Sequence, residues 1–165
     1  MQASKFIKTQ EGCRLTAYVC SGGNRTIGYG TSWGRGKTNK ISKELADRLF
    51  FYELIDCEQY LKDRITVQLF DYEWVALADH VYNLGSLSTG IIELVNNYKM
   101  EEAAALMSQY IHADGRVIRG LKIRVKARVE LFLGKKRVNL EAKGKKDILC
   151  TVNKPLTYLK DLTPR

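Results

Sequence analysis

Three residues near the start of the chain, Glu11, Cys20 and Thr26, are of types that could carry out chemistry together. The segment between Cys20 and Thr26 is rich in turn-forming Gly and Asn, and it separates two stretches, 15–19 and 25–30, that are typical of paired strands. Paired strands lie about 5 Å apart, so a hairpin would bring Cys20 and Thr26 within side-chain reach. Hydrolysis of a glycosidic bond needs a proton donor on the leaving oxygen and a second group opposite it. A carboxyl group held across the hairpin mouth, with a thiol and a hydroxyl, could supply both.

The same three residue types also have commoner structural roles. A glutamate at a helix end is usually solvated, a strand cysteine is usually part of the core, and threonine is a good strand former. Residue types and spacing alone therefore leave both a catalytic and a structural role open.

The elements that must position these residues are predicted by periodicity and capping signals. Ser4 is expected to cap a helix at 4–11, and glycines dominate the hairpin region that follows. Ser42 is expected to cap a long helix that could bridge two lobes. Four further helices are expected at about 74–85, 89–95 with Thr89 as the cap, 101–110, and 121–134.

This order of elements predicts an α+β fold that is mainly helical. A small β-hairpin lobe would span 12–40, and a long helix at 42–65 would join it to a larger helical lobe at 66–134, against which the helix at 4–11 packs. The domain would therefore cover residues 1–134. Residues 135–165 form a basic C-terminal extension of unknown role.

Charge and composition narrow the classes of partner. The 165 residues carry a formal net charge of +9, which favours nucleic acid, anionic lipid or an anionic cell wall. The last predicted helix presents Lys122, Arg124, Lys126 and Arg128, a basic face that we expect to be solvated. No nucleic-acid motif or interleaved aromatic platform accompanies it, which disfavours nucleic acid as the partner.

Neither a metal site nor membrane insertion is expected. The four cysteines do not have zinc-ligand spacing, so we expect no structural metal and no cofactor. No apolar run reaches the length of a membrane span, and the first ten residues lack the apolar stretch of a signal peptide. The chain is therefore expected to be made in a cytoplasm without stable membrane insertion.

The run EGCRLTAYVCSGGNRTIGYGT at 11–31 resembles the active-site signature of phage-type lysozymes, the endolysins of glycoside hydrolase family 24. That signature is Glu, eight residues, Asp or sometimes Cys, five residues and Thr, and it is matched without a gap. The segments 82–85 and 113–117 also resemble sequences of the family, so that the resemblance covers about residues 4–134.

The resemblance implies a lysozyme-like fold and hydrolysis of the β-1,4 bond between N-acetylmuramic acid and N-acetylglucosamine in bacterial peptidoglycan. Glu11 would be the general acid, Cys20 the base or nucleophile, and Thr26 the residue that positions water. It further implies a monomer, made in the cytoplasm of a host bacterium, that reaches the wall through a holin-type pore. The residues expected to bind substrate are Tyr18, Arg25, Tyr29 and Asn83.

Two positions depart from the family pattern. Thr31 stands where the family often has His, and Arg128 stands where it usually has Glu. Cys20 itself leaves two mechanisms open. As a thiolate it could activate water and invert the anomeric carbon, which analogy with Asp-bearing members favours, or it could attack that carbon and give retention. A catalytically silent peptidoglycan-binding module of the same fold is the alternative function, and a disulfide between Cys13 and Cys20 is an alternative fate of the thiol.

Overall fold

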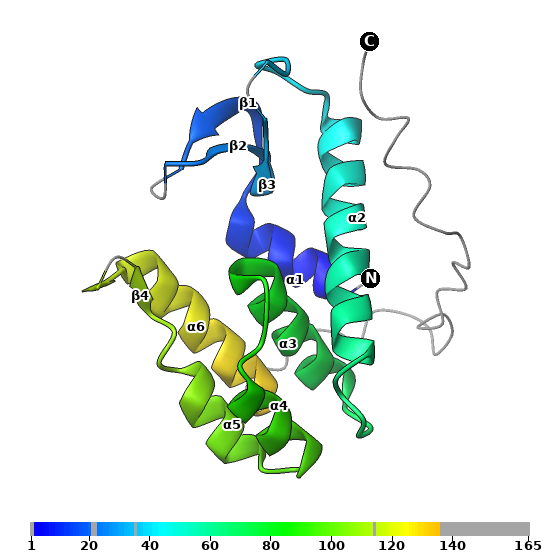
Figure 1. Ribbon diagram of the computed structural model, residues 1–165, viewed down its shortest axis with the longest axis vertical. Helices are drawn as coiled ribbons and strands as arrows, with labels where there is room; N and C mark the ends of the chain where they lie inside the picture. The colour runs from blue at the N-terminus through cyan, green and yellow to red at the C-terminus, as the bar shows by residue number, and fades with distance from the viewer. Residues whose placement is uncertain (1, 21–22, 35, 114, 136–165) are drawn as a thin grey trace.

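The computed structural model describes residues 2–20, 23–34, 36–113 and 115–135, with six helices and five short strands among them. Figure 1 shows a small three-stranded sheet near one end of α2 and the helices α3 to α6 gathered on the other side of α1. The predicted class, α+β and mainly helical, is confirmed. The elements in chain order are α1 Gln2–Glu11, β1 Arg14–Val19, β2 Arg25–Gly28, β3 Thr31–Ser32, α2 Lys43–Lys62, α3 Asp71–Leu84, α4 Thr89–Asn96, α5 Met100–Met107, β4 His112–Ala113, β5 Arg116–Val117 and α6 Arg119–Phe132.

The sheet is antiparallel in the order β1-β2-β3, with the predicted hairpin as its first two strands. Thr26 lies on the central strand, opposite Tyr18 on one side and Ser32 on the other. The returning strand ends at Gly28, earlier than the predicted residue 30. Gly28 has a φ of 67° and Gly30 a φ of 101°, values that glycine tolerates and that turn the chain out of the strand.

The long helix α2 begins where the sequence predicts. The Ser42 hydroxyl accepts a 3.1 Å hydrogen bond from the Leu45 N–H, which caps the helix. Its buried residues are spaced three or four apart, so that one stripe of the 20-residue helix faces the core. These residues are Ala46, Phe50, Leu54, Cys57 and Leu61.

Helix α3 is the central element of the helical lobe. Every residue from Val75 to Val81 is buried, because α1, α2 and α6 all pack against this helix. Gly85, with a φ of 83°, ends it in the left-handed conformation, as predicted. A helix covered on several sides places its polar residues in the interior, and Asp79 and His80 are both fully buried there.

The helix ends differ from the predicted ones in small ways. Ser88 caps α4 in place of the expected Thr89, and the Ser88 hydroxyl accepts from the Ile91 N–H. α5 ends at Met107, before the predicted residue 110. The tail at 136–165, which includes Cys150, and the turn residues 21–22 lie outside the described residues. The domain boundary at 134 stays a prediction.

The expectation of a solvated basic face on the last helix is wrong for two of its four residues. Lys122 and Lys126 are exposed, but Arg124 is only 7% exposed and Arg128 is fully buried. Both arginines lie on the side of α6 that packs against α3, where Asp79 supplies a buried carboxylate. A buried arginine requires a partner of opposite charge. The spacing of residues within α6 cannot show that another helix supplies such a carboxylate.

Candidate functional site

Glu11 lies at the C-terminal end of α1, where the sheet and two helices of the helical lobe meet. Its Oε1 accepts a 2.6 Å hydrogen bond from Arg124 Nη1, and 18% of the Glu11 side chain stays exposed. The other carboxylate oxygen lies beside Gly30, since a Cβ at that glycine would stand 3.3 Å from Glu11 Oε2. The carboxyl group is thus held by α6 and the β2–β3 turn while part of it is accessible to a ligand.

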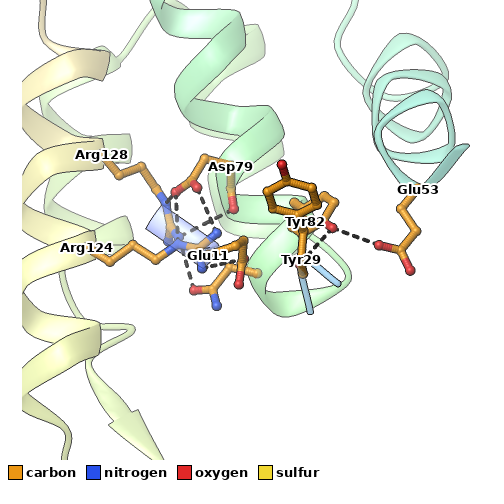
Figure 2. A network of polar contacts seen from close by, with 8 residues as sticks. Glu11, Tyr29, Glu53, Asp79, Tyr82, Arg124 and Arg128 are labelled. Carbon is orange, nitrogen blue, oxygen red and sulfur yellow. Dashed lines mark hydrogen bonds and ion pairs between the residues drawn. The ribbon is translucent and has the colours of Figure 1, made fainter. Parts of the chain in front are cut away.

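Arg124 is shared between two carboxylates. While its Nη1 contacts Glu11, its Nη2 donates a 2.8 Å hydrogen bond to Asp79 Oδ1. Arg128, one turn further along α6, donates from Nε to Asp79 Oδ2 at 2.6 Å. Figure 2 shows the two arginines reaching from α6 toward Asp79 on α3, with Glu11 beside the end of Arg124. Two arginines and two carboxyl groups form this cluster, so its charges balance when Glu11 is ionised.

Burial raises the pKa of Glu11 above its ordinary value of 4.5. The neighbouring Arg124 cation opposes this shift, and the Asp79 carboxylate adds to it. A carboxyl group with a raised pKa keeps its proton to higher pH, which is the property that a general acid needs.

Cys20 and Thr26 are brought together by the turn that joins β1 to β2. The Cys20 N–H donates to the Asn24 carbonyl at 2.9 Å, and the Thr26 hydroxyl donates to the same carbonyl at 3.1 Å. Cys20 is partly exposed, whereas Thr26 is only 6% exposed. The hairpin therefore places Cys20 at a partly exposed position and Thr26 on its buried central strand.

Three of the four predicted substrate-binding residues are already engaged in protein contacts. The Arg25 guanidinium donates to the carbonyls of Gly34 and Thr38 and to Asn39 Oδ1, so it holds the loop after β3. Asn83 Oδ1 accepts from Arg128 Nη2 at 3.1 Å. The Tyr29 ring is buried against Phe50, which argues against a direct contact between this ring and a substrate.

Tyr18 is the fourth of the predicted binding residues. It is partly exposed on β1, and the Arg14 guanidinium lies over its ring at 4.4 Å from the centroid. An aromatic ring at this place could stack on the apolar face of a sugar, with Arg14 beside it.

The family model for phage lysozymes matches residues 8–128 of this chain, nearly all of the sheet and helices described above. The chain belongs to the phage lysozyme family. Among curated relatives, an endolysin of Acyrthosiphon pisum secondary endosymbiont phage 1 is 32% identical over 80 residues. That match covers 48% of this chain and 55% of the relative, so the chain spans about half the length of the curated relative that it matches.

Two solved structures of similar fold are an endolysin and a muramidase domain. The endolysin from Escherichia coli O157:H7 phage FAHEc1 is 28% identical with a TM-score of 0.71, over 82% of this chain and 92% of that one. The muramidase domain of SpmX from Asticaccaulis excentricus is 25% identical with a TM-score of 0.70, over 80% of this chain and 95% of that one. The predicted lysozyme-like fold and the predicted family are thereby confirmed.

Within this phage lysozyme fold, the departure at position 128 now has a physical account. Arg128 brings a cation into a place where it is fully buried, and Asp79 on α3 supplies the carboxylate that balances it. At position 31, where the other departure lies, Thr31 is buried and its hydroxyl has no hydrogen-bond partner among the described residues.

Sequence reasoning missed Asp79, the buried role of Arg124, and the pair formed by Tyr82 and Glu53. The Tyr82 hydroxyl lies 2.7 Å from Glu53 Oε2 and 3.0 Å from the Tyr29 carbonyl oxygen (Figure 2). A signal for Arg124 was present, since 124, 128 and 131 follow helical spacing on one stripe that ends in apolar residues. No comparable signal in the sequence pairs Tyr82 with Glu53. In the part of the chain that the structure describes, no group of three His, Cys, Asp or Glu residues could hold a metal ion.

Proposed function

We propose that this phage lysozyme family member is an endolysin-type muramidase that hydrolyses the β-1,4 bond between N-acetylmuramic acid and N-acetylglucosamine in bacterial peptidoglycan. The observation that carries the proposal is Glu11, a partly accessible carboxyl group whose pKa burial raises, at the junction of α1, α6 and the β2–β3 turn. It is the group best suited to protonate a leaving oxygen.

Cys20 is proposed as the group that acts opposite Glu11, with Thr26 as its companion. The Asn24 carbonyl accepts from both residues, which holds them beside each other. The Thr26 hydroxyl donates its proton in a hydrogen bond to that carbonyl. Its oxygen can therefore accept a hydrogen bond from a water. A water held there could be activated by the Cys20 thiolate, giving inversion. Direct attack by the thiolate is the retaining alternative.

The test is release of reducing ends from purified peptidoglycan by four proteins: wild type, Glu11→Gln, Cys20→Ser and Cys20→Asp. Wild type should release them, Glu11→Gln should lose at least about a hundredfold in rate, and Cys20→Asp should keep more activity than Cys20→Ser. Circular dichroism of each variant controls for folding. Full activity of Glu11→Gln would reject Glu11 as the general acid. The anomer formed first, followed by NMR, separates the two roles of Cys20, since a product of retained configuration rejects water activation.

A catalytically silent peptidoglycan-binding module is the second candidate, and one observation favours it. The 2.6 Å ion pair with Arg124 stabilises the ionised form of Glu11, which cannot donate a proton. Sedimentation of the protein with insoluble peptidoglycan, without release of reducing ends, would support this module against the hydrolase.

In the biological setting that the resemblance implies, the protein acts as a monomer on the wall of its host and passes the membrane through a holin-type pore. Among the helices of the described residues, none has the length and apolar character needed to span a membrane. Expression in bacteria with and without a co-expressed holin, followed by culture turbidity, tests the route. Light scattering of the purified protein tests the monomer.

A further inference from the structure

The Arg124 guanidinium is divided between an accessible carboxylate and a buried one. On one side it meets Glu11, whose side chain is 18% exposed, and on the other it meets Asp79, which is fully buried. Both oxygens of Asp79 are engaged, because Oδ1 accepts from Arg124 Nη2 at 2.8 Å and Oδ2 accepts from Arg128 Nε at 2.6 Å. Asp79 therefore cannot turn away from Arg124 without losing its contact with Arg128.

Arg128 holds Asp79 from a place that no solvent reaches. Its side chain is fully buried and also donates to the Asp79 carbonyl and to Asn83 Oδ1. His80 Nδ1, at 3.4 Å, is an acceptor for Arg128 Nη1. Arg128 makes no hydrogen bond with Glu11 in this network, so it acts on Glu11 through the charge of its guanidinium and through its hold on Asp79.

We infer that Asp79 is a positioning residue for Glu11: by competing for Arg124, it holds that cation between two carboxylates and keeps Glu11 from a full ion pair. The inference rests on the proposed role of Glu11 as the general acid. It also answers the observation that favours a silent module, because an arginine shared with Asp79 stabilises the Glu11 carboxylate less than an arginine devoted to it.

Charge counting gives the direction of the effect. With Asp79 present, the two arginines are balanced by two carboxylates, whereas an amide at position 79 leaves a surplus positive charge beside Glu11. An added positive charge favours the ionised form of a neighbouring carboxyl group. The charged or titratable groups that act on Glu11 come from three helices, and they are Arg124 and Arg128 on α6, Asp79 and Tyr82 on α3, and Glu53 on α2.

The experiment measures the Glu11 carboxyl directly, by carbon-13 NMR titration, in wild type, Asp79→Asn and Asp79→Asn/Arg128→Met. In Asp79→Asn we expect the pKa of Glu11 to fall by about one pH unit or more, since two cations then act on one carboxylate. The alkaline limb of the lysis profile should move to lower pH by the same amount, because a general acid is active only while protonated. A merely structural role for Asp79 would lower activity at every pH without moving that limb.

The double variant keeps the inference testable if Asp79→Asn does not fold. It removes a buried cation together with its buried partner, an exchange that proteins tolerate far better than loss of one partner. The pKa of Glu11 should again fall, by less than in the single variant, because the Arg128 cation has gone as well. Glu102→Gln, an exposed carboxylate on α5, is the control for one lost negative charge and should leave Glu11 unmoved.

An unchanged Glu11 titration in a folded Asp79 variant would overturn the inference. This result is distinct from failure of the proposed function, which would show as wild-type protein that releases no reducing ends. The NMR titration needs no substrate, so it tests the effect of Asp79 on Glu11 in either case.

Discussion

Arg124 and Glu11 are joined by a 2.6 Å hydrogen bond although they stand 113 positions apart in the chain. The contact links the end of the first helix to the last helix of the described fold, across the face of α3 that carries Asp79. It gives the Glu11 carboxyl group a fixed orientation beside the β2–β3 turn. The same contact opposes the rise in the pKa of Glu11 that burial produces. The site is thus a balance between burial, one shared cation and one hidden carboxylate.

Gly30 is predicted to be required for its lack of a side chain. A methyl group there would stand 3.3 Å from Glu11 Oε2, and the φ of 101° is one that alanine adopts only with strain. Gly30→Ala should therefore lose both activity and about 1–2 kcal/mol of stability. Gly36→Ala is the matched control, because its φ of 86° imposes similar strain with nothing within 4 Å of the new methyl group. Comparable stability losses with full activity only in Gly36→Ala would support the close approach to Glu11. Equal activity in both variants would reject it.

Arg128→Met is expected to be strongly destabilising, although methionine fills much of the same space. The substitution leaves the Asp79 carboxylate buried with one partner fewer, which costs about 3–5 kcal/mol. Lys126→Met on the same helix, where the side chain is 77% exposed, should change stability by less than about 0.5 kcal/mol. Urea denaturation monitored by circular dichroism gives both values. A small loss in Arg128→Met would mean that Asp79 finds other partners or takes up a proton.

Glu53 and Tyr82 form a cluster in which the Tyr82 hydroxyl alone cannot donate to both of its neighbouring oxygens. The Tyr82 hydroxyl lies within hydrogen-bond distance of both the Tyr29 carbonyl and the Glu53 carboxyl, and a hydroxyl has one proton to donate. Both bonds form together when Glu53 is protonated, and burial raises the pKa of Glu53 in that direction. The unfolded chain ionises at lower pH, so the free energy of unfolding should decrease as pH rises from about 4.5 through the raised pKa.

Glu53→Gln tests this cluster, because an amide donates to Tyr82 at every pH. The variant should flatten that part of the stability profile and be at least as stable as wild type at pH 7. Tyr82→Phe should instead lose about 1–2 kcal/mol, since the Tyr29 carbonyl loses its side-chain donor. Chemical denaturation between pH 4 and pH 8 measures all three proteins. A Glu53→Gln variant much weaker than wild type at pH 7 would contradict the protonated cluster.

His80 is predicted to make the fold sensitive to acid. Burial lowers the pKa of His80 from 6.5 to about 3, and the Arg128 cation acts in the same direction. In the unfolded chain the imidazole takes up a proton near pH 6.5, so stability that is present above this pH is lost as pH falls toward 3. His80→Gln keeps an acceptor for Arg128 and should be less sensitive to pH over this range. His112→Gln, at an exposed position on β4, is the control for loss of a histidine. Identical pH dependence of His80→Gln and wild type would refute the prediction.

The local elements of this protein could be predicted from its sequence. Ser42 caps the start of α2 and Gly85 ends α3, both as predicted. The strands β1 and β2 pair as the expected hairpin. These features depend on contacts between residues close in the chain, which capping and turn preferences describe. The family signature that predicts a role for Glu11 is local in the same way, since its three positions lie within one short segment.

What surrounds Glu11 was decided by the tertiary structure. The basic face of α6 has the pattern of a solvated surface, yet Arg124 and Arg128 are buried because α3 brings Asp79 to meet them from 45 and 49 positions away. Tyr29 has the type of a sugar-binding residue, yet packing against Phe50 places its ring in the core. Whether a charge can be buried depends on a partner of opposite sign, and only the packing of distant helices determines whether that partner is there.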